Sequence, residues 1–140
     1  MKNFPMKYLY LGFILFLCLF LFFIGRSVDN SEHGSYKLAV RTIDEDAGRY
    51  NYKVEVFNGI DTICNIDDAE NKILKINLFV NSGDFVLMFV DDEQGEIVLA
   101  NDTFEGDIDI SQYNSGKLKI KGSRANFSFN IEIAEKIIQK

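Results

Sequence analysis

The side chains that could carry out chemistry in this chain are few and scattered. There is one histidine, His33, and it precedes the first β-like segment. General acid–base catalysis near neutral pH most often uses a histidine held in place by its surroundings. A Ser-His-Asp or Cys-His centre therefore has no suitable base, and neither a phosphate loop nor a multi-histidine zinc pattern occurs. We expect no catalytic, cofactor-binding or metal-binding residue, and a protein that is not an enzyme.

Acidic residues are the chemical groups that recur along the chain. They cluster at residues 44–46, 67–68, 91–93 and 102–109. Calcium takes about six to eight oxygen ligands, but no cluster has the spacing of an EF-hand loop. The segment 91–95, DDEQG, is more typical of a hairpin turn. Asp107 and Asp109 share one strand face, which is either a ligand pair or a solvated face. Calcium binding by the acidic loops remains an open alternative.

Lysines and tyrosines offer further candidates, each with a structural and a functional interpretation. Three lysines alternate along one segment, which is typical of a solvated face or a lysine-guarded edge strand. The functional alternative is contact with an anionic polymer. Tyr50 and Tyr52 belong either to the core or to a sugar-stacking surface. The lysines are Lys117, Lys119 and Lys121.

The two cysteines, Cys18 and Cys64, are not expected to pair. Cys18 lies inside a long apolar run, whereas Cys64 lies in a β-like segment of the acidic part of the chain. If the run lies within a bilayer, the two sulfur atoms cannot meet. Cys64 is then a small buried side chain or, alternatively, an intermolecular thiol.

The long apolar run covers residues 8–25, YLYLGFILFLCLFLFFIG, without a single charge. A helix of this length spans about 27 Å, close to the roughly 30 Å of a bilayer core. Lys2 and Lys7 precede the run and only Arg26 closely follows it, so the positive-inside rule places the N-terminus in the cytoplasm. The sequence therefore predicts a cytoplasmic leader at 1–7 and a transmembrane segment at 8–25 that contacts the lipid bilayer.

Cleavage of this segment is the alternative to permanent anchoring. A signal peptide has an apolar region of about 7–15 residues followed by an A-x-A-like site. The run here is longer, and Gly25-Arg26-Ser27 is the only weak candidate site. We expect an uncleaved signal anchor; if cleavage occurs, the remainder is a secreted domain. Residues 26–35 are polar and read as a spacer.

The rest of the chain, residues 36–140, has the patterning of an all-β domain. Apolar and polar residues alternate from Tyr36 onward, and the run at 85–90 is apolar throughout, as in a strand covered on both faces. Turn signals containing glycine, among them residues 58–59, 82–84 and 122–123, recur roughly every 8–12 residues. We expect about eight antiparallel strands in a two-sheet, jelly-roll-like sandwich outside the cytoplasm, with isolated helical turns at 67–72 and 134–140 at most.

Three stretches carry a resemblance to a known kind of domain. They are 90–96 (VDDEQGE), 116–122 (GKLKIKG) and 127–131 (FSFNI). With these, residues 74–133 resemble small extracytoplasmic β-sandwich domains of low-GC Gram-positive bacteria, found in lipoproteins and anchored proteins of unknown function. The final half is also similar to pre-peptidase C-terminal jelly rolls. The resemblance implies a fold and a compartment but no activity. The lipobox usual in those lipoproteins is absent.

Charge and topology together indicate a class of function. Residues 27–140 hold 12 Lys and Arg against 21 Asp and Glu, a formal net charge of −9. Such a domain repels nucleic acid. We therefore expect a membrane-anchored extracellular binding or interaction module whose ligand is an unknown protein or cell-envelope component. The alternative is a small structural or assembly subunit of a membrane complex.

Overall fold

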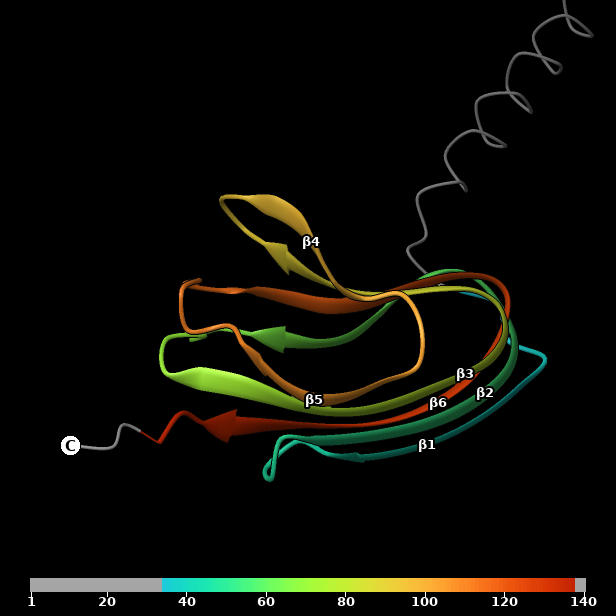
Figure 1. Cartoon of the computed structure of the whole chain (residues 1–140), viewed down its shortest axis with the longest axis horizontal. Coiled ribbons are helices and arrows are strands. Elements are labelled where there is room, and N and C mark those ends of the chain that lie inside the picture. Colours follow the sequence, from blue (N-terminus) through green and yellow to red (C-terminus); the bar gives the residue numbers. More distant parts are fainter. Residues whose placement is uncertain (1–33, 138–140) are drawn as a thin grey trace, which may run out of the picture. The chain divides into compact units, whose positions relative to one another are not determined.

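The computed structural model describes residues 34–137, which form six antiparallel β-strands (Figure 1). The strands are β1 (Leu38–Asp44), β2 (Arg49–Ile66), β3 (Lys72–Asp91), β4 (Gly95–Ala100), β5 (Phe104–Asp109) and β6 (Gly116–Glu135). They make one sheet in the order β1-β2-β6-β3-β4, and β5 also pairs with β3. The prediction of an all-β antiparallel domain is thus confirmed for this part of the chain.

The sheet is folded over on itself into two layers, as Figure 1 shows. Strands β2, β3 and β6 are 18, 20 and 20 residues long and run through both layers. In the first layer, β1 and β5 flank the early parts of β2 and β3 and the late part of β6. In the second, β4 pairs with the late part of β3. We call these layer A and layer B; together they form a β-sandwich-like domain.

The corner between the layers is made by irregularities at matching positions of the three long strands. Register shifts occur between Val54 and Gly59 of β2 and between Val80 and Asp84 of β3. Extra residues of this kind bend a strand and increase its twist. Left-handed backbone conformations also gather here, at Val56, Gly59, Gly83 and Arg124.

Two asparagine side chains stabilise this corner. The Val56 backbone N–H donates to Asn126 Oδ1 at 2.7 Å, and the Arg124 N–H donates to Asn58 Oδ1 at 2.9 Å. Each asparagine thus bonds to a backbone group of the neighbouring strand. Backbone donors displaced from a ladder need such partners when water is excluded. The pair of bonds therefore holds β2 and β6 together where both strands turn.

Aromatic side chains fill the space between the layers. Phe57 is fully buried; its ring stacks with that of Tyr36 at 5.0 Å and meets Phe127 edge-on at 5.9 Å. Phe127 also packs against Phe85, with ring centroids 4.5 Å apart. Burial of large apolar side chains is the main stabilising term of such a domain. Because Phe57 and Phe85 lie beside the corner, bending and core packing depend on each other.

The prediction of about eight strands is too high because three pairs of predicted strands are continuous. The glycine-containing segments at residues 58–59, 82–84 and 122–123 were expected to be turns, but they are bends within β2, β3 and β6. A single folded sheet also differs from the two separate sheets of a jelly roll. The expected helical turn at 67–72 is not helical, and β6 extends to Glu135.

The predicted leader and membrane segment, residues 1–7 and 8–25, lie outside the residues that the structure describes. So does most of the predicted spacer at 26–35. Its last residue, Ser35, exchanges two backbone hydrogen bonds with Asn58, at 2.8 and 3.0 Å. Between residues 34 and 137, no helix is long and apolar enough to cross a bilayer.

Replacing Gly83 by alanine tests the importance of the corner. Gly83 has φ +79°, and a Cβ there would lie 2.2 Å from the carbonyl oxygen of Arg124. We expect Gly83→Ala to lower the free energy of unfolding by about 2–4 kcal/mol, through the left-handed conformation and a backbone clash. Urea unfolding of the full chain in detergent, followed by circular dichroism, measures this change.

Gly95→Ala is the matched control for this substitution. Gly95 has nearly the same φ, +84°, but no atom lies within 4 Å of the added Cβ. Gly95→Ala should lower the free energy of unfolding by about 1 kcal/mol, which is the cost of placing alanine in a left-handed conformation. Equal losses for the two variants would contradict a tightly packed corner at Gly83.

Candidate functional site

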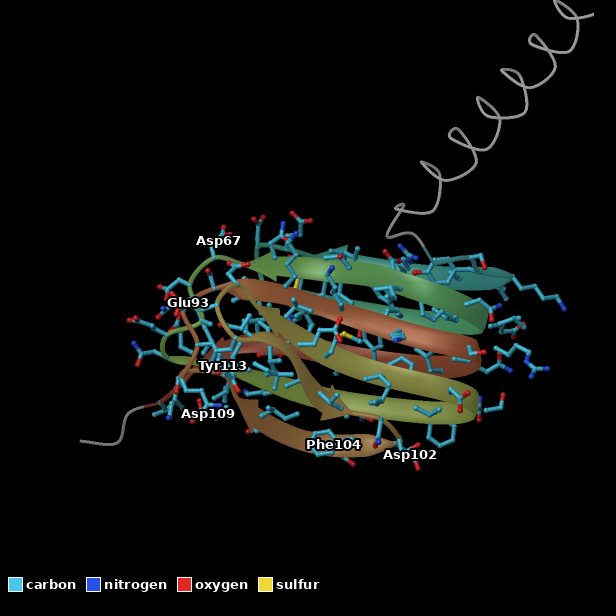
Figure 2. The ribbon with its side chains drawn as sticks, turned by 90° about the horizontal axis from the view of Figure 1, so that it is seen from above. Asp67, Glu93, Asp102, Phe104, Asp109 and Tyr113 are labelled. Carbon is cyan, nitrogen blue, oxygen red and sulfur yellow. The ribbon has the colours of Figure 1, made fainter. Side chains whose placement is uncertain are left out.

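Members of all four acidic clusters meet at one end of the domain, away from the corner. Figure 2 shows Asp67, Glu93 and Asp109 at this end, while Asp102 lies elsewhere along the edge. A hollow of about 460 Å³ lies here, with Glu45, Asp46, Asp67 and Asp68 among the residues that line it. The sequence could not predict that these clusters are neighbours, because turns and strand ends far apart in the chain carry them.

Several of these acids have structural roles. Asp91 is buried, and its Oδ1 accepts hydrogen bonds from the backbone N–H groups of Glu93 and Gln94 at 2.9 and 2.6 Å. This confirms the predicted hairpin turn between β3 and β4. Asp109 is bonded by Lys136 Nζ at 2.6 Å and by the Ser111 N–H, and these bonds hold the pKa of its carboxyl well below the usual range. Among the described side chains, no three potential ligands are grouped so as to hold a metal ion.

An ion-pair cluster closes one side of the sandwich between β1 and the late part of β2. Arg41 Nη2 lies 3.0 Å from Asp61 Oδ2, and the Tyr36 hydroxyl also donates to Asp61. The guanidinium stacks over the rings of Tyr36 and Tyr52 at 4.4 and 5.0 Å. Burial is the main cause that raises the pKa of Tyr36, and the hydrogen bond to Asp61 raises it further. Each charged group is paired, so the cluster is a stabilising contact between the layers.

The predicted lysine stripe is on a central strand, which corrects the edge-strand interpretation. Strand β6 lies between β2 and β3, and Lys119 is buried at 8% exposure, while Lys117 and Lys121 are exposed. The stripe therefore cannot guard an edge. Its position was misjudged because alternation shows which side chains share a face but not the order of strands in the sheet.

Tyr50 and Tyr52 are core residues, with exposures of 6% and 4%. The Tyr52 ring stacks with that of Phe129 at 4.7 Å. Burial, with the neighbouring Cys64, raises the pKa of Tyr50 to about 12. These rings therefore belong to the core, and a sugar-stacking role for them is excluded.

The outer face of layer A carries a regular grid of polar side chains that the sequence did not reveal. Asn130, Asn77 and Glu105 stand opposite one another on β6, β3 and β5. The next row repeats this arrangement two residues along each strand. We call the six residues the polar hexad: Asn130, Asn77, Glu105, Glu132, Lys75 and Asp107.

A shallow hollow of about 320 Å³ lies over the polar hexad and is lined by all six of its members. Glu132 Oε1 is 4.0 Å from Lys75 Nζ, and Arg49 lies 3.6 Å from the other oxygen of Glu132. Within residues 34–137, the side-chain amides of Asn77 and Asn130 bond to no other side chain. The face thus offers donors and acceptors that are open to solvent.

Two residues extend the polar hexad along the same face. Asn51 stands opposite Asn130 on β2, which lengthens the amide row to three strands. Phe79 follows Asn77 two positions along β3, so its ring emerges on the same side of the layer, and it is 52% exposed. An exposed aromatic ring beside unpaired amides is suited to binding a ligand that has both apolar and hydroxyl-bearing surfaces.

Comparison with known proteins adds no assignment. The chain matches no family model and no curated protein sequence. The resemblance of residues 74–133 to extracytoplasmic β-sandwich domains therefore stays a prediction.

Alkylation of Cys64 tests the environment of the single described thiol. Burial raises its pKa to about 11, while a hydrogen bond with Tyr50 acts in the opposite direction. Near pH 8 the folded thiol should react with iodoacetamide roughly 100-fold more slowly than in urea, because the thiolate is the nucleophile. The rate should rise as the pH approaches that pKa. Peptide mass spectrometry measures the alkylation of Cys64 separately from that of Cys18.

Tyr50→Phe provides the comparison for this measurement. It removes the bond that lowers the pKa of Cys64, so the folded thiol should become still slower to react. Equal alkylation rates in the folded and unfolded chain would contradict the buried position and would favour a role as an accessible intermolecular thiol.

Proposed function

We propose that this chain is a membrane-anchored, non-enzymatic binding module that works outside the cytoplasm. Residues 8–25 are the uncleaved anchor, and residues 36–140 are the part that meets the ligand. The proposal for the anchor is supported by the uncharged run of 18 residues and by the basic residues before it. The proposal for binding is supported by the outer face of layer A.

The observation that carries the binding proposal is the polar hexad together with Phe79. Neighbouring strands are about 4.8 Å apart and alternate residues about 7 Å apart, so the polar hexad covers roughly 10 by 7 Å. That area matches one or two sugar rings. A glycan chain of the cell envelope or of the surroundings is accordingly the ligand class that we propose.

The chemistry of the face fits vicinal hydroxyl groups. Each asparagine amide has two donors and one acceptor oxygen, so it can bond to two neighbouring hydroxyls at once. The carboxylates of Glu105 and Asp107 accept hydrogen bonds from further hydroxyls. The ring of Phe79 offers an apolar platform for the C–H face of a sugar.

The rigidity of this platform also favours binding. The polar hexad stands on three hydrogen-bonded strands whose register continues without a shift from Lys72 to Val80 of β3. Side chains on paired strands are positioned more accurately than those on loops. Little conformational entropy of the backbone is therefore lost when a ligand is bound.

The double variant Asn77→Ala/Asn130→Ala tests the proposal. We expect the full chain in detergent to bind members of a glycan array, and we expect the variant to lose at least about tenfold in affinity through loss of two amide contacts. Phe79→Ala should weaken binding similarly. Gln94→Ala removes an exposed amide at the β3–β4 turn and is the control, with unchanged binding expected.

Two outcomes would contradict the proposal in different ways. If the full chain binds no glycan on the array, the proposed ligand class is wrong. Glycan binding that survives in the double variant and in Phe79→Ala would place the ligand on another surface of the domain. Circular dichroism of each variant confirms that the sheet is intact.

A further inference from the structure

Strand β1 is an edge of the folded sheet that is open to pairing. It is the last strand in the sheet order, and within the described part of the chain its outer side pairs with no other strand. All seven of its residues are exposed. The free edge of a strand presents backbone N–H and C=O groups that can extend the sheet with another chain.

Most of the usual protection of an edge strand is missing from β1. Natural edges carry lysine, proline, a bulge or inward-pointing charges. Residues 38–44, LAVRTID, contain neither lysine nor proline, and their pairing with β2 continues without a register shift. The one inward-pointing charge, Arg41, is neutralised by Asp61 at 3.0 Å and lies over two tyrosine rings, so it would not be left unpaired if the edge gained a partner strand.

The other edges of the sheet are better protected against pairing than β1 is. Strand β5 carries Glu105, Asp107 and Asp109, which would repel a second acidic strand. Strand β4 meets β3 with a register shift, and the late part of β2 has another between Thr62 and Cys64. Among the described edges, β1 is therefore the one suited to pairing.

Exposed apolar side chains are concentrated on the same strand. Leu38, Val40 and Ile43 are 53%, 58% and 45% exposed, and they make up half of the large exposed apolar side chains of the described residues. Leu38 and Val40 alternate with Ala39 and Arg41, so both lie on the outer face of layer A. Covering them would remove apolar surface from water, which favours association.

We propose that the partner of β1 is β1 of a second copy, paired antiparallel about a twofold axis at Val40. In that register Val40 faces Val40 of the second copy, Leu38 faces Thr42, and Ala39 faces Arg41. No like charges oppose each other. A register centred one residue later would place two Arg41 side chains opposite each other, which is unfavourable.

Self-pairing fits this edge better than pairing with a basic or acidic partner. The seven residues carry one positive and one negative group, Arg41 and Asp44, and are neutral overall, although the chain as a whole has a formal charge of −6. A twofold interface uses the same patch on both copies, and the pattern of β1 is complementary to itself. The two copies would join their A layers into one continuous sheet and place two polar hexads on one surface.

Disulfide cross-linking of the full chain in membranes tests this pairing. In a Cys18→Ser/Cys64→Ser background, Val40→Cys should become a covalent dimer on mild oxidation, because opposed Cβ atoms lie about 4.5–5.5 Å apart. Thr42→Cys is the matched control on the same face. Its two copies would be about 13 Å apart along the strands, so it should stay monomeric. Leu38→Cys/Thr42→Cys should dimerise again.

The unlinked protein provides a second, independent measurement. Native mass spectrometry from detergent should give a dimer for the unchanged chain and a monomer for Val40→Lys, which places a guarding charge on the edge. Circular dichroism shows whether that variant keeps its sheet. The proposal is overturned if Val40→Cys does not cross-link, if Thr42→Cys cross-links equally well, or if the unchanged chain is monomeric.

Discussion

Two hydrogen bonds accepted by the side-chain oxygens of Asn58 and Asn126 hold the place where the sheet turns over. Each asparagine bonds to a backbone N–H of the neighbouring strand, at 2.9 and 2.7 Å, beside residues in left-handed conformations. A single bent strand would leave its neighbours unpaired, so β2, β3 and β6 must bend together. Gly83 makes this possible on β3, because its lack of a side chain lets the backbone pass close to Arg124. Without the corner there would be neither a second layer nor an enclosed core.

The same corner determines which surfaces are available for binding. Folding the sheet turns one face of each long strand inward, where Phe57, Phe85 and Phe127 pack together. The opposite face of layer A is left to solvent. Its side chains are positioned by the registers of β3, β5 and β6, which bring residues from three distant segments into the polar hexad. The proposed binding surface and the core are thus two faces of the same paired strands.

Local patterns in the sequence predicted some features well and missed others for physical reasons. Alternation predicted strands with one buried face, and along residues 74–80 the alternating Leu74, Ile76 and Leu78 are buried while Val80 is partly buried. The fully apolar run at 85–90 was predicted to be covered on both faces, and this holds only in part: on the side opposite Phe89, Met88 is buried, but Val86 and Val90 are half-buried. These features depend only on the period of a single strand.

Features that depend on pairing between distant strands were not predictable. Glycines at a bend and at a turn look alike in sequence, so continuous strands were divided and the strand count was too high. The central position of β6 was missed because alternation shows which side chains share a face but not the order of the strands in the sheet. The polar hexad was also missed, because Asn77 and Asn130 are ordinary outward positions until the register places them side by side.

In the function proposed above, the apolar segment at residues 8–25 attaches the outer face of layer A to a membrane. The intact mass of the native protein, taken from a membrane fraction, tests that connection most directly. A mass of 16.0 kDa, corresponding to the complete chain, is the predicted result and means that the anchor is retained. A species that begins near Ser27 would contradict it, and the domain would then act as a secreted binding protein.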